Sequence, residues 1–286
     1  MRRVLALLLP CLLALAPLTA GCGEEDVDPD ALAEAAEATR GQGGVHMVMD
    51  STIEGGGMPE VALRMEGDVD FVERRMHAKL DGAPLAKAAG VDDRDQFDME
   101  QIVIGTTFYM RMPMLTESLG VDWVKMDLQK VGEAAGLDFS QLMQLGSGDP
   151  GQQLEQLHAM SDLEEVGRED VDGVATTHYK GEVDLRRFAD VVPEEDREKT
   201  RKSMDRLIEM MGRSRYPTEV WIDDDHLIRR QRFSMSMRKP QEMEMDMDVR
   251  YSDFGKQVDI RAPKGEIRDM TEVATRSQGQ GDLFGP

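Results

Sequence analysis

The residue with the most distinctive chemistry in this chain is Cys22, because its thiol is left alone once the segment before it is removed. Two arginines precede an apolar run from Val4 to Leu18, which is too short for a comfortable membrane span and is typical of a secretion signal. Cleavage just before Cys22 would also discard Cys11, the only other cysteine. The mature chain would then have neither a disulfide partner nor a cysteine cluster for a metal.

The residues before Cys22 carry a processing motif. The run Leu18-Thr19-Ala20-Gly21-Cys22 resembles the lipobox of bacterial lipoproteins, in which small residues precede a cysteine that becomes the first residue and is lipidated. The resemblance implies that residues 1–21 are a signal peptide. It also implies a diacylglycerol on Cys22, whose two acyl chains suffice for stable anchoring. The alternative, an ordinary cleaved signal, leaves an exposed thiol in a secreted chain unexplained.

Other residues that carry chemistry lack the spacing that chemistry needs. Residues 146–151 match G-x-G-x-x-G by letter, but Pro150 removes an amide that would face phosphate, so they indicate a loop. Residues 26–37 place acids as in a calcium loop, yet Ala31 replaces the required glycine. The histidines are scattered and no nucleophile motif accompanies them: His46, His77, His158, His178 and His226. We therefore expect no catalytic residue, no metal, no cofactor and no enzyme.

Methionine, with 22 residues against 5% aromatics, is the outstanding residue type. In residues 242–249 every odd position is apolar and every even one acidic, which predicts a strand with one thioether face and one charged face. Such residues often simply fill a core. Met is flexible, however, and is typical of surfaces that adapt to variable ligands. Nine methionines are therefore candidate ligand-binding residues: Met47, Met49, Met110, Met112, Met235, Met237, Met243, Met245 and Met247.

The net charge restricts the possible partners. It is −22 for the whole chain and −24 for the 265 residues from Cys22 onward, since the signal segment carries two arginines and no acid. A chain this acidic does not hold nucleic acid or an anionic membrane surface by charge. The plasma membrane is therefore a partner only through lipidated Cys22.

Periodicity predicts one α+β domain over residues 31–270, between an acidic tether (22–30) and a flexible C-terminal tail (271–286). A capped helix is expected from residue 28 to 41, two helical segments at 137–145 and 152–160, and a charged helix at 193–211. About ten strands are expected from the alternation of apolar and polar residues, over the segments 45–53, 61–69, 76–80, 102–104, 108–114, 123–126, 163–171, 174–183, 219–222, 227–237, 243–249 and 258–261. They indicate a curved antiparallel sheet with helices on its concave side.

Several segments in order resemble one family of lipoproteins. They are the lipobox, a helix before Val45-His46, Gly105 to Arg111 leading to Trp123-Val124-Lys125, Val166 to Tyr179, and Pro217 to Asp223 before Leu227 to Arg230. Together they resemble the LppX and LprAFG type of actinobacterial cell-envelope lipoprotein. That family resembles the LolA and LolB carriers in fold, a half-open β-barrel with helices at its mouth, and several members bind acyl chains of lipids or lipoglycans.

Two functions follow from these observations. The first is a lipoprotein, anchored on the extracytoplasmic face of the cell membrane, that binds or transfers a lipid or lipoglycan in a Met-rich cavity. The second is an interaction or sensory lipoprotein with a packed core and no transport role. A hydrolase would require Ser, His and Asp to meet in one pocket. The oligomeric state stays open.

Overall fold

The computed structural model describes residues 29–134, 160–190, 192, 194–238 and 242–280. The helices are α1 (Pro29–Gly41), α2 (Ala83–Ala89), α3 (Pro113–Leu119), α4 (Leu128–Ala134), α7 (Glu194–Met211) and α8 (Thr271–Gln280), with short 3-10 helices η1 (Arg94–Phe97) and η2 (Leu185–Ala189). The strands are β1 (Gly44–Gly55), β2 (Met58–Asp70), β3 (Arg75–Leu80), β4 (Met99–Ile104), β5 (Thr107–Arg111), β6 (Trp123–Asp127), β7 (Met160–Val171), β8 (Val174–Asp184), β9 (Arg215–Asp223), β10 (Ile228–Met237), β11 (Met243–Ser252) and β12 (Ile267–Asp269). The helical segments expected at 137–145 and 152–160 fall outside these residues, except that Met160 begins β7.

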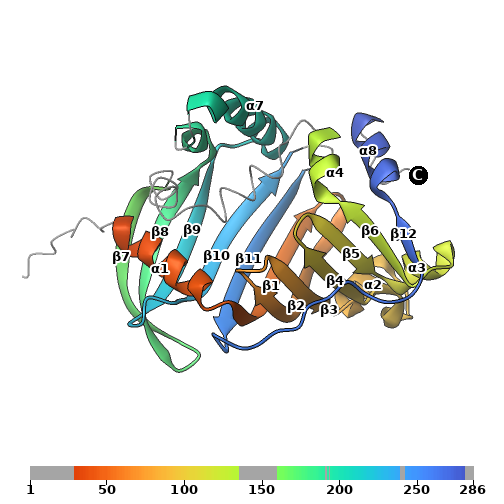
Figure 1. Ribbon diagram of the computed structural model, residues 1–286, viewed down its shortest axis with the longest axis horizontal. Coiled ribbons are helices and arrows are strands. Elements are labelled where there is room, and N and C mark those ends of the chain that lie inside the picture. Colours follow the sequence, from red (N-terminus) through yellow and green to blue (C-terminus); the bar gives the residue numbers. More distant parts are fainter. Residues whose placement is uncertain (1–28, 135–159, 191, 193, 239–241, 281–286) are drawn as a thin grey trace, which may run out of the picture.

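One sheet of 12 strands holds the fold together. Its order is β12-β6-β5-β4-β3-β2-β1-β11-β10-β9-β8-β7, and all neighbours are antiparallel except β12 and β6. The end strands β12 and β7 do not pair with each other, so the sheet stays open. It curves strongly, with α1 across β8–β10 and α7, α4 and α8 above its upper end (Figure 1). The prediction of an α+β domain on a curved, half-open antiparallel sheet is confirmed.

The pairing register separates the side chains of the sheet into two faces, because directly paired residues share a face and chain neighbours point to opposite faces. Met49 pairs with both Met65 and Val249, whereas Asp50 pairs with Arg64 and Asp248. We call the first side the methionine face and the second the charged face. The alternation read from the sequence therefore corresponds to the two sides of the sheet.

Helix α1 covers part of the methionine face. Its Leu32 and Ala35 are buried against Val220 of β9 and Ile228 of β10, and Tyr251 of β11 packs on the same cluster. Buried Thr39 ties the end of the helix to the sheet, since its Oγ1 accepts a hydrogen bond of 2.8 Å from the Ile228 N–H. Helix α1 is thus held by both apolar burial and one buried polar contact.

A second, smaller core lies on the charged face of β4–β6. Val258 and Ile260, from the segment between β11 and β12, pack there with Ile102, Trp123 and Tyr109. The sequence predicted a strand at 258–261, and this is wrong: the segment has no regular secondary structure. Its apolar residues alternate as in a strand because they cover one surface of the sheet. The segment does not pair with the edge strand β6, because β12 pairs with β6 in parallel.

Two further predictions are corrected. The strand expected at 108–114 ends at Arg111, because Pro113 cannot donate to a sheet and instead begins α3, with Met112 as its N-cap. The flexible tail expected from residue 271 is a helix as far as Gln280. Thr271 starts it with paired hydrogen bonds, donating its N–H to Asp269 Oδ1 (2.9 Å) and accepting from the Asp127 N–H (3.0 Å). These contacts fix the start of α8 beside β6.

Candidate functional site

Eight of the nine predicted methionines meet on the methionine face. The register pairs Met235 with Met245 and Met237 with Met243, and it aligns Met47, Met49, Met110 and Met247 on the same side. Met112 is the exception, since it lies beyond the last paired residue of β5. Met47 and Met247 are buried at 5% and 7% exposure, whereas Met237 at the rim is 38% exposed. The remaining five are half-buried.

The same face holds four methionines that the sequence did not single out: Met65, Met76, Met99 and Met126. Each stands alone among other apolar residues in its strand, so no thioether stripe is visible in the sequence. The register through β1–β6 is the signal that would have found them. With them, 12 methionines share one face: Met47, Met49, Met65, Met76, Met99, Met110, Met126, Met235, Met237, Met243, Met245 and Met247.

The methionine face carries no charged side chain at the paired positions of β1–β6, β10 and β11. Its polar exceptions are neutral. Gln101 donates its amide N–H to the Met65 sulfur, and the Tyr251 hydroxyl donates to Gln231 Oε1 over 3.4 Å. Burial raises the pKa of Tyr251 to about 12, so the phenol stays protonated near neutral pH. The face therefore provides flexible apolar surface with a few neutral hydrogen-bonding groups.

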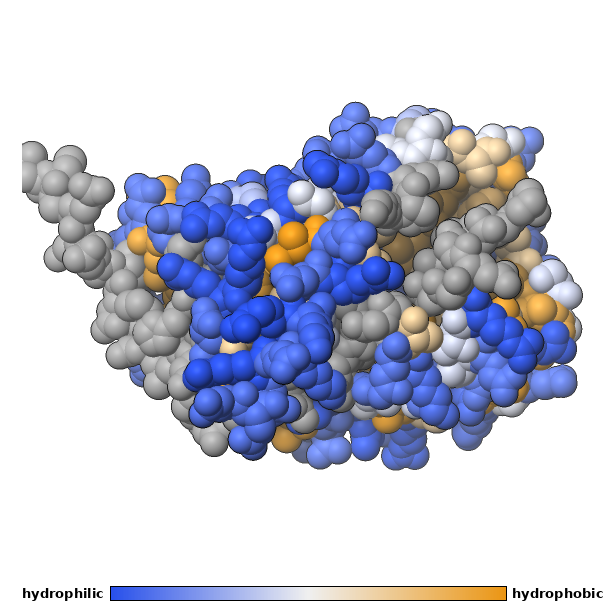
Figure 2. Space-filling model, turned by 90° about the horizontal axis from the view of Figure 1, so that it is seen from above, coloured by the Kyte–Doolittle hydropathy of each residue, from blue (hydrophilic) through white to orange (hydrophobic). Residues whose placement is uncertain are grey.

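Seen from above, the molecule is mostly hydrophilic on its surface, and hydrophobic residues are visible where that surface is recessed (Figure 2). Hydrophobic residues are thus exposed in patches among hydrophilic ones in this view of the molecule (Figure 2). Met49, Met235 and Met245 are half-buried, so the described residues cover these side chains only in part.

The charged face is organised around five carboxylates, each held between two basic or imidazole side chains. Asp248 shows the pattern: it accepts from Arg230 Nε over 2.8 Å and from Arg232 Nη2 over 3.2 Å. Burial opposes ionisation of Asp248, but the hydrogen bonds and charges of the two arginines outweigh it and lower its pKa. The other four are Asp50 (Arg64, Arg250), Asp68 (His46, Lys256), Glu100 (His77, Arg111) and Glu219 (His178, Lys180). We call these five sets the charge clamps.

One clamp is built around a buried aromatic stack. His178 is 3% exposed and lies parallel to Trp221, while the Arg230 guanidinium lies 4.5 Å from the centroid of the Trp221 ring. His178 contacts Glu169 (3.0 Å) through Nδ1 and Glu219 (2.7 Å) through Nε2. Both ring nitrogens of the imidazole are thereby used in contacts with carboxylates, so this histidine has a structural role.

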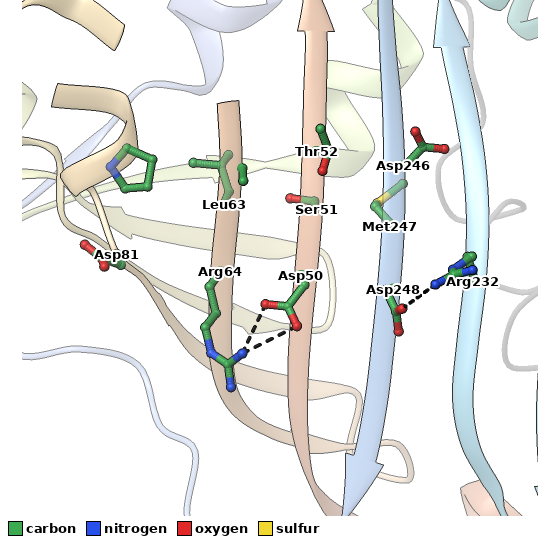
Figure 3. Close-up of a pocket in the computed structure, with 12 residues that line it drawn as sticks. Asp50, Ser51, Thr52, Leu63, Arg64, Asp81, Arg232, Asp246, Met247 and Asp248 are labelled. Atoms are coloured by element: carbon green, nitrogen blue, oxygen red, sulfur yellow. Dashed lines mark hydrogen bonds and ion pairs between the residues drawn. The ribbon is translucent and has the colours of Figure 1, made fainter. Parts of the chain in front are cut away.

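Three adjoining hollows, of about 530, 540 and 470 Å³, lie along the charged face and the adjacent α2–η1 segment, and Asp81 lines all three. Figure 3 shows the first, viewed from the side of the sheet opposite to Figure 1. Asp50 and Arg64 form an ion pair at one wall, and Asp248 and Arg232 form another. Charged side chains contribute to the lining of all three hollows, and Leu63 and Met247 of the methionine face also border the first.

Within the part of the chain that the structure describes, no group of three or more His, Cys, Asp or Glu residues could hold a metal ion. The same residues contain no helix long and apolar enough to cross a membrane. Cys22 lies outside the described residues, so its lipidation remains a prediction from the sequence.

Comparison with known proteins adds the family. Residues 28–260 match the model of the LppX_LprAFG lipoproteins. A 31.2 kDa protein of Streptomyces griseus is 26% identical over 156 residues, which are 52% of this chain and 48% of the relative, so the match spans about half the length of that relative.

Solved structures of similar fold include the lipoprotein LppX of Mycobacterium tuberculosis (TM-score 0.48, 17% identity, 82% of this chain and 100% of that chain). LprF of Mycobacterium bovis has a TM-score of 0.39 and 17% identity over 83% of this chain and 97% of its own. A LolA superfamily protein of Nitrosomonas europaea has a TM-score of 0.27 and 8% identity over 80% and 94%. Because the family model covers most of the chain, this protein belongs to the LppX_LprAFG lipoprotein family.

Proposed function

We propose that this protein is a lipoprotein, anchored through Cys22 on the extracytoplasmic face of the cell membrane, that binds or transfers lipid acyl chains on its methionine face. The observation that supports this most strongly is the alignment of 12 methionines on one side of an open sheet, with no charged side chain at the paired positions of β1–β6, β10 and β11 on that side. Membership of a lipoprotein family agrees with it.

The chemistry of methionine suits a chain of variable shape. The thioether side chain is unbranched and polarisable, so neighbouring methionines can repack around a ligand with little strain. Rigid aromatic rings are rare, at 5% of the sequence, and only Phe108, Phe233 and Tyr251 stand on this face at the paired positions of β1–β6, β10 and β11. A face of this composition accepts acyl chains by shape adaptation and not by a fixed pocket.

The energetics favour a carrier without a catalytic group. Burying a methylene contributes about 0.8 kcal/mol relative to water, but a bilayer offers an acyl chain nearly the same environment. Transfer from the membrane to the methionine face therefore requires little net free energy in either direction. Exchange needs only that the protein be held near the membrane, which two acyl chains on Cys22 would achieve.

The second candidate is an interaction lipoprotein that carries no lipid. The hollows around Asp81 favour it, because they are formed by described residues and carry several charged side chains in their lining, such as Asp50, Arg64 and Asp68. This function would leave the methionines as ordinary core residues.

Mass spectrometry of organic extracts separates the two candidates. The full chain is purified from membranes of its native host, extracted and compared with a mock purification. Lipid carriage predicts acyl lipids in stoichiometric amounts beyond those covalently attached at Cys22. Recovery of no acyl lipid beyond that covalently attached at Cys22 would contradict the proposal and favour the interaction function.

A further inference from the structure

The neutral polar groups on the methionine face bear on which lipids it accepts. Tyr251 of β11 and Gln231 of β10 are diagonal neighbours there, since Gln231 pairs with Val249. The Tyr251 ring is fixed by the α1 cluster on one side and by an edge contact with Phe71 at 6.0 Å on the other. These contacts hold the Tyr251 hydroxyl beside the Gln231 side chain.

The hydrogen bonds of this pair are incomplete. Gln231 Oε1 accepts from Tyr251 at 3.4 Å, which is long for a hydrogen bond between two oxygens. No residue that the structure describes accepts from Gln231 Nε2, although a primary amide carries two donor hydrogens. The pair thus has donor capacity that an oxygen atom of a ligand could use.

The charge of this surface limits the ligand further. At the paired positions of β1–β6, β10 and β11 there is no lysine, arginine or histidine on the methionine face. An ionised carboxylate or phosphate buried there would lose its hydration without gaining a counter-charge, which is strongly unfavourable. A neutral ester, in contrast, needs only one or two donors to its carbonyl oxygen.

We propose that Gln231 and Tyr251 form a polar anchor on the methionine face that hydrogen-bonds the carbonyl of a neutral acyl ester and so selects acyl esters over ionised fatty acids. This inference rests on the proposed function, because it assumes that acyl chains bind the face. It adds the chemical class of the ligand and the residues that select it.

The chain offers a matched control at Gln101. This residue is the other glutamine on the same face, and its amide is already bonded to the Met65 sulfur. The register places it in the row of Tyr251, Met47, Gly67 and Ala78. It is therefore four strand spacings from Tyr251, or ~19 Å along the sheet. Gln101→Met makes the same chemical change as Gln231→Met at a distance from the anchor.

The test compares three ligands of similar chain length: methyl palmitate, palmitic acid at mildly alkaline pH, and hexadecane. Each is delivered from cyclodextrin to the full chain, and affinity is measured by displacement of a fluorescent hydrocarbon probe. Wild type is expected to bind the ester about tenfold more tightly than hexadecane, and more tightly than the ionised acid. Gln231→Met and Tyr251→Phe should lose the preference for the ester while binding hexadecane as before, and Gln101→Met should keep it.

Two results would overturn the anchor and leave the proposed function intact: an ester preference that survives in both anchor variants, or an equal loss in Gln101→Met. A wild-type protein that binds neither hexadecane nor the probe would instead contradict the proposed function itself, and the anchor with it. Thermal unfolding of each variant shows whether a lost preference comes from a lost fold.

Discussion

The imidazole of His178 is stacked on the indole of Trp221, with ring centroids 4.1 Å apart and planes 10° from parallel. The stack lies on the charged face, and Trp221 Nε1 donates to the same Glu169 that His178 contacts. The stack thus belongs to the hydrogen-bonded charged face, on the opposite side of the sheet from the methionine face.

We expect His178→Ala to lower the free energy of unfolding by about 2–3 kcal/mol, because it removes a buried ring and leaves Glu219 with one partner fewer. His77→Ala is the matched control. That histidine also contacts a carboxylate, Glu100, at 2.7 Å, but its side chain is 39% exposed, so the loss should stay below about 1 kcal/mol. Urea denaturation of both variants measures the difference, and equal losses would contradict the structural role of the stack.

The two arginines of the Asp248 charge clamp should contribute unequally to the free energy of unfolding. Arg230 forms two hydrogen bonds with Asp248 and lies over Trp221, whereas Arg232 makes a single contact and is 48% exposed. Arg230→Ala is expected to cost about 2 kcal/mol and Arg232→Ala no more than about 0.5 kcal/mol. Denaturant midpoints test this order, and a larger loss in the Arg232 variant would reverse the assignment.

Acid should weaken the fold through the same clamp. The pKa of Asp248 is lowered in the folded state, as is that of Asp68. Their contribution is therefore present above the unfolded pKa of about 4 and disappears as the pH falls through the folded value. Asp248→Asn should reduce the slope of the unfolding free energy against pH on the acid side. A slope unchanged from wild type would show that this carboxylate is not linked to folding.

The attachment of α1 to the sheet should depend on the Thr39 hydroxyl. Thr39→Val keeps the shape but leaves the Ile228 N–H without its acceptor, which we expect to cost about 1–3 kcal/mol. Thr39→Ser retains the oxygen and should lose less than half as much. Hydrogen exchange at the Ile228 amide reports the bond directly, and strong protection in the valine variant would contradict its importance.

The sequence was sufficient for the pattern within each strand but not for contacts between strands. Alternation in residues 242–249 placed Met245 and Asp246 on opposite faces, because side-chain direction in a strand depends only on the local backbone. The clamps and the anchor were not predictable: Asp50 meets Arg250 across 200 positions, and such pairs depend on register. Lone methionines such as Met65 were missed for the same reason.

Three sequence-based predictions were wrong because the same residue pattern can occur in more than one kind of local structure. Val258 and Ile260 alternate like strand residues, yet they cover a small core outside the sheet. Polar residues after position 270 suggested a loose tail, but Thr271 and Asp269 begin a helix through hydrogen bonds that composition does not reveal. Pro113 was the local signal that should have ended the strand at Arg111.

Neighbouring residues on opposite faces provide a functional test. Met245→Glu places a charge on the methionine face and should weaken binding of an acyl probe at least about tenfold, since a buried carboxylate there has no partner. Glu244→Gln changes the neighbouring side chain on the charged face, which is exposed, and should leave binding unchanged. Fluorescence titration of both folded variants measures the contrast, and equal affinities would contradict the choice of face.

The central claim, that acyl chains bind the methionine face, is tested most directly by NMR of protein labelled with 13C at its methionine methyl groups. Met114 of α3 is 48% exposed and stands apart from the face, so it provides an internal control. After addition of methyl palmitate, we expect nuclear Overhauser contacts from chain methylenes to the methyl groups of Met49, Met65, Met235 and Met245, and none to Met114. Contacts absent from those four methyl groups, or equally strong at Met114, would contradict the account.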